Sequence, residues 1–425
     1  MRSGYREIGE FVQQVNIRNT GLAATNLQGI SINKYFMPSV ANINGTDLAK
    51  YKVVKQKQFA FNPMHVGRDE VLPIAMLDSD DSVIVSPAYV VFEVIDKQAL
   101  LPEYLMMWCS RPEFDRNAWF TTDSSVRGGF SWDDFCALTL PVPLLEKQQK
   151  ILKEYQVIVD RIKLNERLSQ KLDETAQAIY KHWFVDFEFP MSAEYASSIG
   201  KPELEGQPYK SSGGEMVFNE VLEQEIPKNW QEKRLGQLLT EKGYIRGPFG
   251  SALLKEDMQT KGVPVYEQQH AIGDHRIFRY FIDDDKAKAL ERFRVQPDDC
   301  LVSCSGTLGK VTMIREKDEV GIINQALLIL RPNPKIIPSL LLKAFLSSPR
   351  GYHSLVTSSG GSAQVNIAKK EIIENIIFIL PDSTACDYLT SLLSVIDKNI
   401  QNMKQEILLL EGHSNILLSK LTMQN

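Results

Sequence analysis

Two long segments of the chain place their hydrophobic residues at alternating intervals of four and three. This is the heptad spacing of a coiled-coil seam, and both segments sustain it over more than four heptads. The first seam consists of Ile151, Tyr155, Ile158, Ile162, Asn165, Ser169, Leu172, Ala176, Ile179 and Trp183. The second consists of Leu389, Leu393, Ile396, Ile400, Met403, Ile407, Leu410, Ser414, Leu417 and Leu421. We therefore predict two long helices, each with one apolar stripe.

The two seams belong to a repeat that extends upstream of both helices. Each position of the first seam is separated from its counterpart by the same number of residues, and earlier segments match at the same or a similar offset. They alternate between runs typical of buried strands, short amphipathic helices and Ser/Gly-rich loops. The matched segments are 6–12 with 233–239, 29–32 with 262–265, 51–63 with 293–306, 86–94 with 324–332, 100–114 with 336–352, 122–135 with 357–372, and 140–143 with 378–381.

The repeat predicts an α+β protein with two β-rich domains, each followed by a long helix. A lone helix cannot bury its stripe, but two equal stripes in one chain can bury each other as an antiparallel coiled coil. Asn165 and Ser169 lie in the seam, where they either are buried and fix its register or face solvent. The predicted parts are a first domain at 1–145, a helix at 146–189, a linker at 190–227, a second domain at 228–383 and a helix at 384–425.

Charge and cysteine content narrow the class of protein. The 425-residue chain has a net charge of −5, but residues 1–68 are rich in Lys and Arg whereas residues 69–145 are rich in Asp and Glu. The five cysteines show no metal-binding spacing, which favours reduced thiols in the cytoplasm. We expect neither a secretory signal nor a membrane span, because no apolar run is long enough.

The motifs that could indicate an enzyme are incomplete. The segment NPMH at 62–65 lacks the proline and aromatic residue of the amino-methyltransferase motif, and no Gly-rich cofactor loop precedes it. In CSGTLGKV at 304–311, Cys304 replaces the first glycine of a phosphate loop and Val311 replaces the residue that binds magnesium. The six histidines have no metal-ligand spacing. We therefore expect a binding protein without catalytic or metal-binding residues.

Several loops are suited to binding DNA, although ordinary polar loops would look similar. The segment GYIRGPFGSALLK at 243–255 joins cations to glycines that allow close approach to a phosphate. Amide side chains, as in YEQQHAIG at 266–273, pair with adenine edges. The candidate DNA-binding residues are Asn33, Lys34, Tyr35, Arg68 and Arg127 in the first half, and Arg246, Ser251, Gln268, Gln269, His270 and Lys310 in the second.

Three segments and the repeated layout resemble one family, the DNA specificity subunits of type I restriction–modification enzymes. The segments are YKHWFVDFEFP at 180–190, GQPYKSSGGEMVFNEVLEQEIPKNW at 206–230 and RGPFGSALLKEDM at 246–258. The first half lacks the IPKNW lead-in that precedes the second. The resemblance implies two target recognition domains that read a bipartite DNA site, with two methyltransferase subunits docked on the helices. It also implies that adenine methylation, cleavage, S-adenosylmethionine, ATP and magnesium belong to modification and restriction partners.

Two expectations about the helices follow, and two other functions compete. Ile151 and Trp183 are separated by about 48 Å of helix at ~1.5 Å per residue, or roughly 14 base pairs of spacing between the two domains. Trp183, Phe184 and Phe187 either contact the methyltransferase or cap the helix against a domain.

The alternative functions for the whole chain are a scaffold that does not bind DNA and a solitary DNA-binding regulator. Salt-dependent DNA binding argues against the first, and co-purification with a methyltransferase argues against the second.

Overall fold

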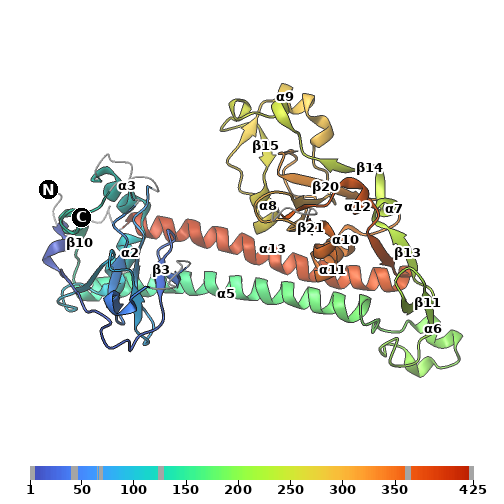
Figure 1. Cartoon of the computed structure of the whole chain (residues 1–425), viewed down its shortest axis with the longest axis horizontal. Coiled ribbons are helices and arrows are strands. Elements are labelled where there is room, and N and C mark those ends of the chain that lie inside the picture. The colour runs from blue at the N-terminus through green and yellow to red at the C-terminus, as the bar shows by residue number, and fades with distance from the viewer. Residues whose placement is uncertain are drawn as a thin grey trace. The chain divides into compact units, whose positions relative to one another are not determined.

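The computed structural model describes residues 5–39, 46–64, 66, 70–122, 129–358 and 365–420. These residues form two compact units. Unit 1 contains Met1–Leu164 and Glu406–Asn425, and unit 2 contains Asn165–Gln405. The two long helices, α5 (Leu145–Phe184) and α13 (Ser383–Lys420), each contribute a part to both units (Figure 1). Each unit thus combines a β-rich body with paired helical segments. The division into five parts that the sequence predicts, namely two domains, two helices and a linker, is a different description of the chain and stays a prediction.

Unit 1 is built around a four-stranded antiparallel sheet in the order β2-β9-β6-β7. Phe59, Phe61, Phe92 and Phe135 are fully buried and form contacting rings in its core. The strands are β1 Tyr5–Glu7, β2 Val12–Gln14, β3 Gln28–Ile30, β4 Phe36–Pro38, β5 Lys52–Val54, β6 Phe59–Phe61, β7 Ile74–Met76, β8 Val83–Val85, β9 Val90–Val94 and β10 Thr139–Pro141. The helices before α5 are η1 Ile8–Glu10, η2 Leu48–Lys50, α2 Pro102–Cys109, α3 Pro112–Phe120 and α4 Trp132–Ala137.

Unit 2 contains a four-stranded sheet in the order β14-β20-β17-β18 and a three-stranded sheet in the order β16-β15-β19. Its strands are β11 Met216–Asn219, β12 Gln224–Pro227, β13 Gln231–Arg234, β14 Leu239–Arg246, β15 Val263–Tyr266, β16 Phe281–Ile282, β17 Cys300–Ser303, β18 Val311–Met313, β19 Ile322–Ile323, β20 Leu327–Pro332, β21 Val356–Ser358, β22 Val365–Ile367 and β23 Ile377–Leu380. Its shorter helices are α6 Ala193–Ser198, η3 Pro202–Leu204, α7 Leu235–Leu238, η4 Gly250–Ala252, η5 Lys255–Asp257, α8 Gln268–Gly273, α9 Asp284–Ala289, η6 Glu291–Phe293, α10 Ser339–Ser347, α11 Pro349–Leu355 and α12 Lys370–Glu374.

The structure repeats in the way that the sequence predicts. Strands β2, β9, β6 and β7 have the same order in their sheet as β14, β20, β17 and β18. A buried polar contact recurs at matching positions, since Gln58 donates to Glu93 at 2.9 Å and Arg331 donates to Asp299 at 2.7 Å. A backbone approach recurs too. A Cβ on Gly9 would lie 2.8 Å from Cys136, and a Cβ on Gly236 would lie 3.1 Å from Glu374. The fold class is therefore confirmed.

Helices α5 and α13 run antiparallel within each unit. In unit 1 Arg161 forms a salt bridge with Glu406 at 2.7 Å, and in unit 2 Trp183 stacks on Tyr388 with ring centroids 5.5 Å apart. Every predicted seam residue up to Leu417 is buried or half-buried, while Leu421 lies outside the described residues. Asn165 is only 1% exposed, and its amide atoms have no hydrogen-bond partner in the described part of the chain. The seam therefore buries this polar residue.

The segment predicted as a linker is folded onto unit 2. It includes α6, η3, β11 and β12, and the last two strands pair with each other. Its side chains Met191, Tyr209 and Ile226 are buried in the same core as Phe189 and Trp230. Phe189 stacks on Tyr209 with ring centroids 4.6 Å apart. Aromatic packing therefore gives order to a segment whose Gly, Pro and Ser content predicts none.

Candidate nucleic-acid interface

Four connections of unit 2 meet at one end of its main sheet. Arg246, the last residue of β14, pairs with Leu328 near the start of β20. Ser303, the last residue of β17, pairs with Leu327, and β18 begins beside it. The connection after β15 joins them because the backbone N–H of Asn324 donates to the carbonyl of Tyr266 at 2.9 Å. The loops that contain Arg246, Gln268 and Lys310 are therefore presented by one rigid edge.

Gln268 is held in place at this edge by the loop after β17. The Ser305 hydroxyl donates to its side-chain oxygen at 2.9 Å. Gly306 has a positive φ of 60°, and a Cβ there would lie 3.1 Å from the Gln268 side-chain nitrogen. The loop therefore approaches the amide closely because residue 306 has no side chain. The fixed oxygen leaves the NH₂ group of Gln268 as a donor, which is one half of a bidentate contact to a base.

The other candidates of unit 2 differ in exposure. Ser251 and Lys310 are exposed, and the half-buried Arg246 guanidinium lies 5.8 Å from the ring centre of Phe249. The Phe249 side chain is 63% exposed, so an aromatic face and a cation project together from this loop. Such a pair can stack on a base while contacting phosphate. Phe249 is not among the residues predicted from the sequence, because an aromatic residue is usually part of a core, but its position between Pro248 and Gly250 is typical of a loop.

His270 and Gln269 do not fit the predicted role in DNA contact. His270 is fully buried, and its ring bonds to the backbone N–H of Glu267 at 2.8 Å and the carbonyl of Ile277 at 3.0 Å. Burial lowers its pKa, which favours a neutral ring that closes this loop. The Gln269 amide donates to Glu267 at 3.1 Å, and Glu267 is also bound by Arg279. Both side chains are therefore bound inside the chain, and their contact with DNA stays a prediction.

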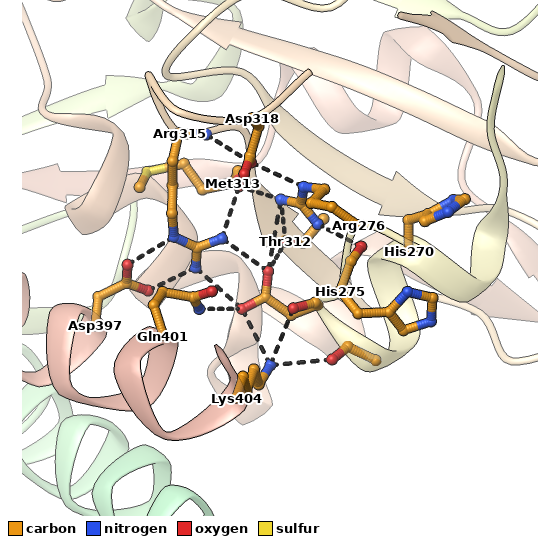
Figure 2. Close-up of polar contacts among 12 residues, drawn as sticks. His270, His275, Arg276, Thr312, Met313, Arg315, Asp318, Asp397, Gln401 and Lys404 are labelled. Carbon is orange, nitrogen blue, oxygen red and sulfur yellow. Dashed lines mark hydrogen bonds and ion pairs between the residues drawn. The ribbon is translucent and has the colours of Figure 1, made fainter. Parts of the chain in front are cut away.

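A network of charges fixes the end of α8 to α13. Asp274 accepts hydrogen bonds from Arg315, Gln401 and Lys404. Figure 2 shows these three side chains, with Arg315 bridging to Asp397. Arg315 donates to both carboxylate oxygens of Asp274 at 3.0 Å, and Lys404 also donates to the carbonyl of Gly273 at 3.0 Å. These contacts come from residues distant in sequence. They hold the short helix that begins at Gln268.

The electrostatics of this network depend on Asp274. Burial alone would raise the pKa of its carboxyl group, but the charges of Lys343 and Arg315 outweigh burial and hold the pKa well below its usual range. The pKa of Asp397 is lowered as well, because hydrogen bonds from Arg315 and the charge of Lys343 outweigh its burial. Both carboxylates are therefore ionised at neutral pH. The cations around them need that charge for compensation.

In unit 1 the candidate residues lie at the tip of the β3–β4 hairpin. Asn33 is exposed and Tyr35 is 54% exposed, so both are available for contact. Lys34 is not, because its Nζ binds Asp115 at 2.7 Å and the carbonyl of Cys109, leaving the side chain 8% exposed. Asp115 also accepts from the backbone N–H of Leu72, which joins the hairpin to the loop before β7. Lys34 therefore anchors the hairpin, and its contact with DNA stays a prediction. Arg68 and Arg127 lie outside the described residues.

The aromatic residues predicted to contact a partner are part of the core of unit 2. Trp183, Phe184 and Phe187 are 8%, 7% and 2% exposed. Phe184 and Phe187 pack on Trp230 with ring centroids 5.0 and 5.7 Å apart. They therefore join the helix to the β-rich body. Their burial favours the first alternative, a cap of the helix against a domain, and contact with a partner stays a prediction.

A different apolar stripe is exposed along both long helices. Its residues on the helices directly precede alternate residues of the seam, as Val157 precedes Ile158 and Val395 precedes Ile396. The side chains of this stripe are 45–65% exposed. In unit 1 the stripe consists of Val157 and Leu164 on α5 and of Leu409 and Ile416 on α13, and in unit 2 it consists of Tyr388 and Val395 on α13 and of Val185, which follows the end of α5. We call it the outer stripe. Its seven-residue spacing is visible in the sequence but is masked there by the stronger seam. An exposed apolar stripe on a helix is typical of a surface that binds another protein.

Other kinds of site are not indicated. Within the ranges that the structure describes, no group of three His, Cys, Asp or Glu residues is arranged to hold a metal ion. All five cysteines are free thiols. None of the described helices combines the length and apolar character needed to cross a membrane.

Comparison with known proteins identifies relatives in sequence. No protein-family model matches the chain. The HindI specificity subunit of a type I restriction enzyme from Haemophilus influenzae is 29% identical over 173 residues, which cover 40% of this chain and 36% of the relative. The MjaIX specificity subunit from Methanocaldococcus jannaschii is 28% identical over 151 residues, which cover 34% of this chain and 29% of the relative. The matched part therefore spans about a third of these relatives' length.

A solved structure has the same fold. It is the S subunit of a type I restriction–modification system from M. genitalium, with a TM-score of 0.51 and 14% identity over 98% of this chain and 95% of that one. The likeness confirms the arrangement of β-rich domains and long helices that the repeat predicts. The chain is thus homologous in part of its sequence to type I restriction enzyme specificity subunits and has the fold of such a subunit, as the resemblance in the sequence predicted.

Proposed function

We propose that this chain is the DNA specificity subunit of a type I restriction–modification complex and that it reads a bipartite site. The observation that carries the proposal is the edge of unit 2, where Arg246 and Lys310 at the end of the main sheet meet Gln268, which follows β15 of the neighbouring sheet and is bound by Ser305. A rigid β scaffold that presents polar loops is suited to recognition. Unit 1 repeats the sheet order and presents Asn33 and Tyr35 on a hairpin. Two such edges in one chain suit a site in two parts.

The chemistry belongs to partners in this proposal. Methyltransferase subunits would bring S-adenosylmethionine, and restriction subunits would bring ATP and magnesium. The outer stripe supports docking, since Val395, Leu409 and Ile416 offer exposed apolar surface along one face of α13. We place the docking surface there rather than at Phe184 and Phe187, which are buried against Trp230. The chain would act in the cytoplasm, where its partners and DNA meet.

The test is methylation by the assembled complex. The chain is co-expressed with the methyltransferase subunit of a type I restriction–modification system from the same genome, and adenine methylation is mapped across that genome. We expect methylation at one bipartite sequence and binding to duplexes of that sequence that weakens steeply with salt. Methyltransferase assembly without sequence-dependent methylation would instead support a scaffold. Salt-dependent DNA binding without methyltransferase assembly would support a solitary regulator.

The half-site assignment has its own control. Gln268→Ala should relax the choice of base at one half-site by about 1–3 kcal/mol if the amide contacts an adenine. Lys310→Ala should weaken binding to every sequence and reduce the salt dependence, because a lysine at this edge contacts phosphate. Equal loss at both half-sites in Gln268→Ala would mean that the residue supports assembly rather than reading.

A further inference from the structure

Unit 2 contains a pocket of about 670 Å³. It lies between the ends of α5 and α13 and the folded segment that follows α5. Five aromatic side chains line it, namely Trp183, Phe189, Tyr195, Tyr209 and Tyr388. Tyr388 is 61% exposed and is also a member of the outer stripe on α13. The pocket is therefore continuous with the surface on which we place the partner.

The charges around the pocket have one sign. Glu194, Glu205 and Asp382 line it, and none of its described lining residues is Lys, Arg or His. Asp382 accepts from the backbone N–H of Ala385 at 2.9 Å and so caps α13. Glu194 and Glu205 are exposed, and no ion pair is found for either within the described ranges. The pocket thus offers two carboxylates that face no cation of the chain.

Aromatic faces beside unpaired carboxylates suit one kind of side chain. A cation over the face of a Tyr or Trp ring is attracted by the negative face of the ring. A guanidinium group fits better than an ammonium group because it is planar, stacks on rings and is more weakly hydrated. The exposed ring of Tyr388, which stacks on Trp183 with ring planes 14° apart, provides such a surface in the wall of the pocket. A neutral apolar side chain would leave the carboxylates without a partner.

We propose that this pocket receives an arginine side chain of the methyltransferase subunit and anchors one end of its contact with the outer stripe. The inference rests on the proposed function, because the methyltransferase is the partner that the outer stripe would bind. It adds the position and the chemistry of the anchor. The carboxylates supply charge complementarity, and the aromatic rings supply the stacking surface. The apolar stripe then supplies the remaining contact along α13.

The first experiment removes charge without disturbing the fold. Affinity for the methyltransferase is measured for the double variant Glu194→Gln, Glu205→Gln in the full-length chain. The matched control is Glu203→Gln, Glu220→Gln, which removes the same charge from exposed residues outside the pocket. We expect roughly three- to tenfold weaker binding in the pocket variant at 0.1 M salt and little change in the control. The difference should shrink at 0.5 M salt, because the carboxylates are exposed.

The second experiment separates stacking from simple burial. Tyr388→Phe keeps the ring and should bind as the wild type does, whereas Tyr388→Leu keeps only apolar surface and should bind about two- to fivefold more weakly. Equal binding by the pocket and control variants, or a difference independent of salt, would overturn the proposal. A loss of self-association in place of methyltransferase binding would overturn it too, because the occupant would then be a second copy. If the wild type binds methyltransferase and the pocket variants do as well, only the anchor is wrong. If the wild type binds none, the proposed function falls with it.

Discussion

Asp274→Asn is expected to detach the short helix α8 from α13. The substitution keeps the shape of the side chain but removes the charge that Arg315, Lys404 and Lys343 surround. Breaking a fully buried pair costs about 3–5 kcal/mol because the remaining charge is left unpaired. The side chains of Asp274 and Arg315 are both 15% exposed and Arg315 keeps Asp397, so we expect about 2–3 kcal/mol. Hydrogen exchange of residues 268–273 should then be roughly 30- to 150-fold faster if that energy limits local opening.

The pH dependence of this effect has a definite sign. The pKa of Asp274 in the folded chain lies below its ordinary value of 3.8, so the folded state favours the ionised form. The contribution to stability is therefore complete above about pH 4–5 and is lost as the pH falls below that value. The wild type and Asp274→Asn should differ by a constant amount between pH 5 and 8 and converge at lower pH.

The control is Asp285→Asn, whose carboxylate is 97% exposed and lies 3.8 Å from Lys288. It should change exchange in α8 by less than twofold, because exposed ion pairs contribute little. Equal protection of residues 268–273 in Asp274→Asn and Asp285→Asn would refute the reasoning. So would a difference that grows as the pH falls below 4.

Three further predictions concern the helices and the reading loop. Asn165→Leu should raise the free energy of unfolding by about 1–2 kcal/mol in urea titrations, because leucine replaces a buried amide that has no hydrogen-bond partner among the described residues. An unchanged or lower free energy of unfolding would contradict the assignment of Asn165 to the seam. Ser305→Ala should broaden base choice at the half-site read by Gln268 in methylation profiles and leave the other half-site unchanged, whereas a profile identical to that of the wild type would show that the hydroxyl does not position the amide. Deleting one matched heptad from both α5 and α13 should shorten the gap between half-sites by about three base pairs and keep both half-site sequences, whereas altered half-sites with an unchanged gap would rule out a spacer role.

Most of the fold could be predicted from the repeat and the heptad spacing of the sequence. They predicted both long helices, the seam and the two β-rich bodies because burial requires a periodic pattern. They did not predict that residues 190–227 would fold onto unit 2. That packing depends on Phe189, Tyr209 and Trp230, which lie far apart in a segment without a period. Tertiary contacts between isolated aromatic residues leave no periodic trace in the sequence.

The candidate site was predicted at the level of loops rather than residues. Residue type alone suggested that Lys34 and His270 would contact DNA, yet each is bound inside the chain. Lys34 binds Asp115, 81 residues later in the chain, and His270 binds the carbonyl of Ile277, 7 residues later. No local sequence motif indicates either pairing. Gln268 and Lys310 lie beside loops that Gly306 and Gly309 shape, and such glycine spacing is visible in the sequence, but their contact with DNA stays a prediction.

The polar contact shared by the two sheets restricts how such a gene can recombine. The first half pairs an amide with a carboxylate, Gln58 with Glu93, while the second pairs a carboxylate with a guanidinium, Asp299 with Arg331. A crossover between the halves that falls between these strands would set Asp299 against Glu93, two carboxylates in a site where Asp299 is fully buried. Viable hybrids should therefore have breakpoints outside β6–β9 and β17–β20, so that each pair is inherited together.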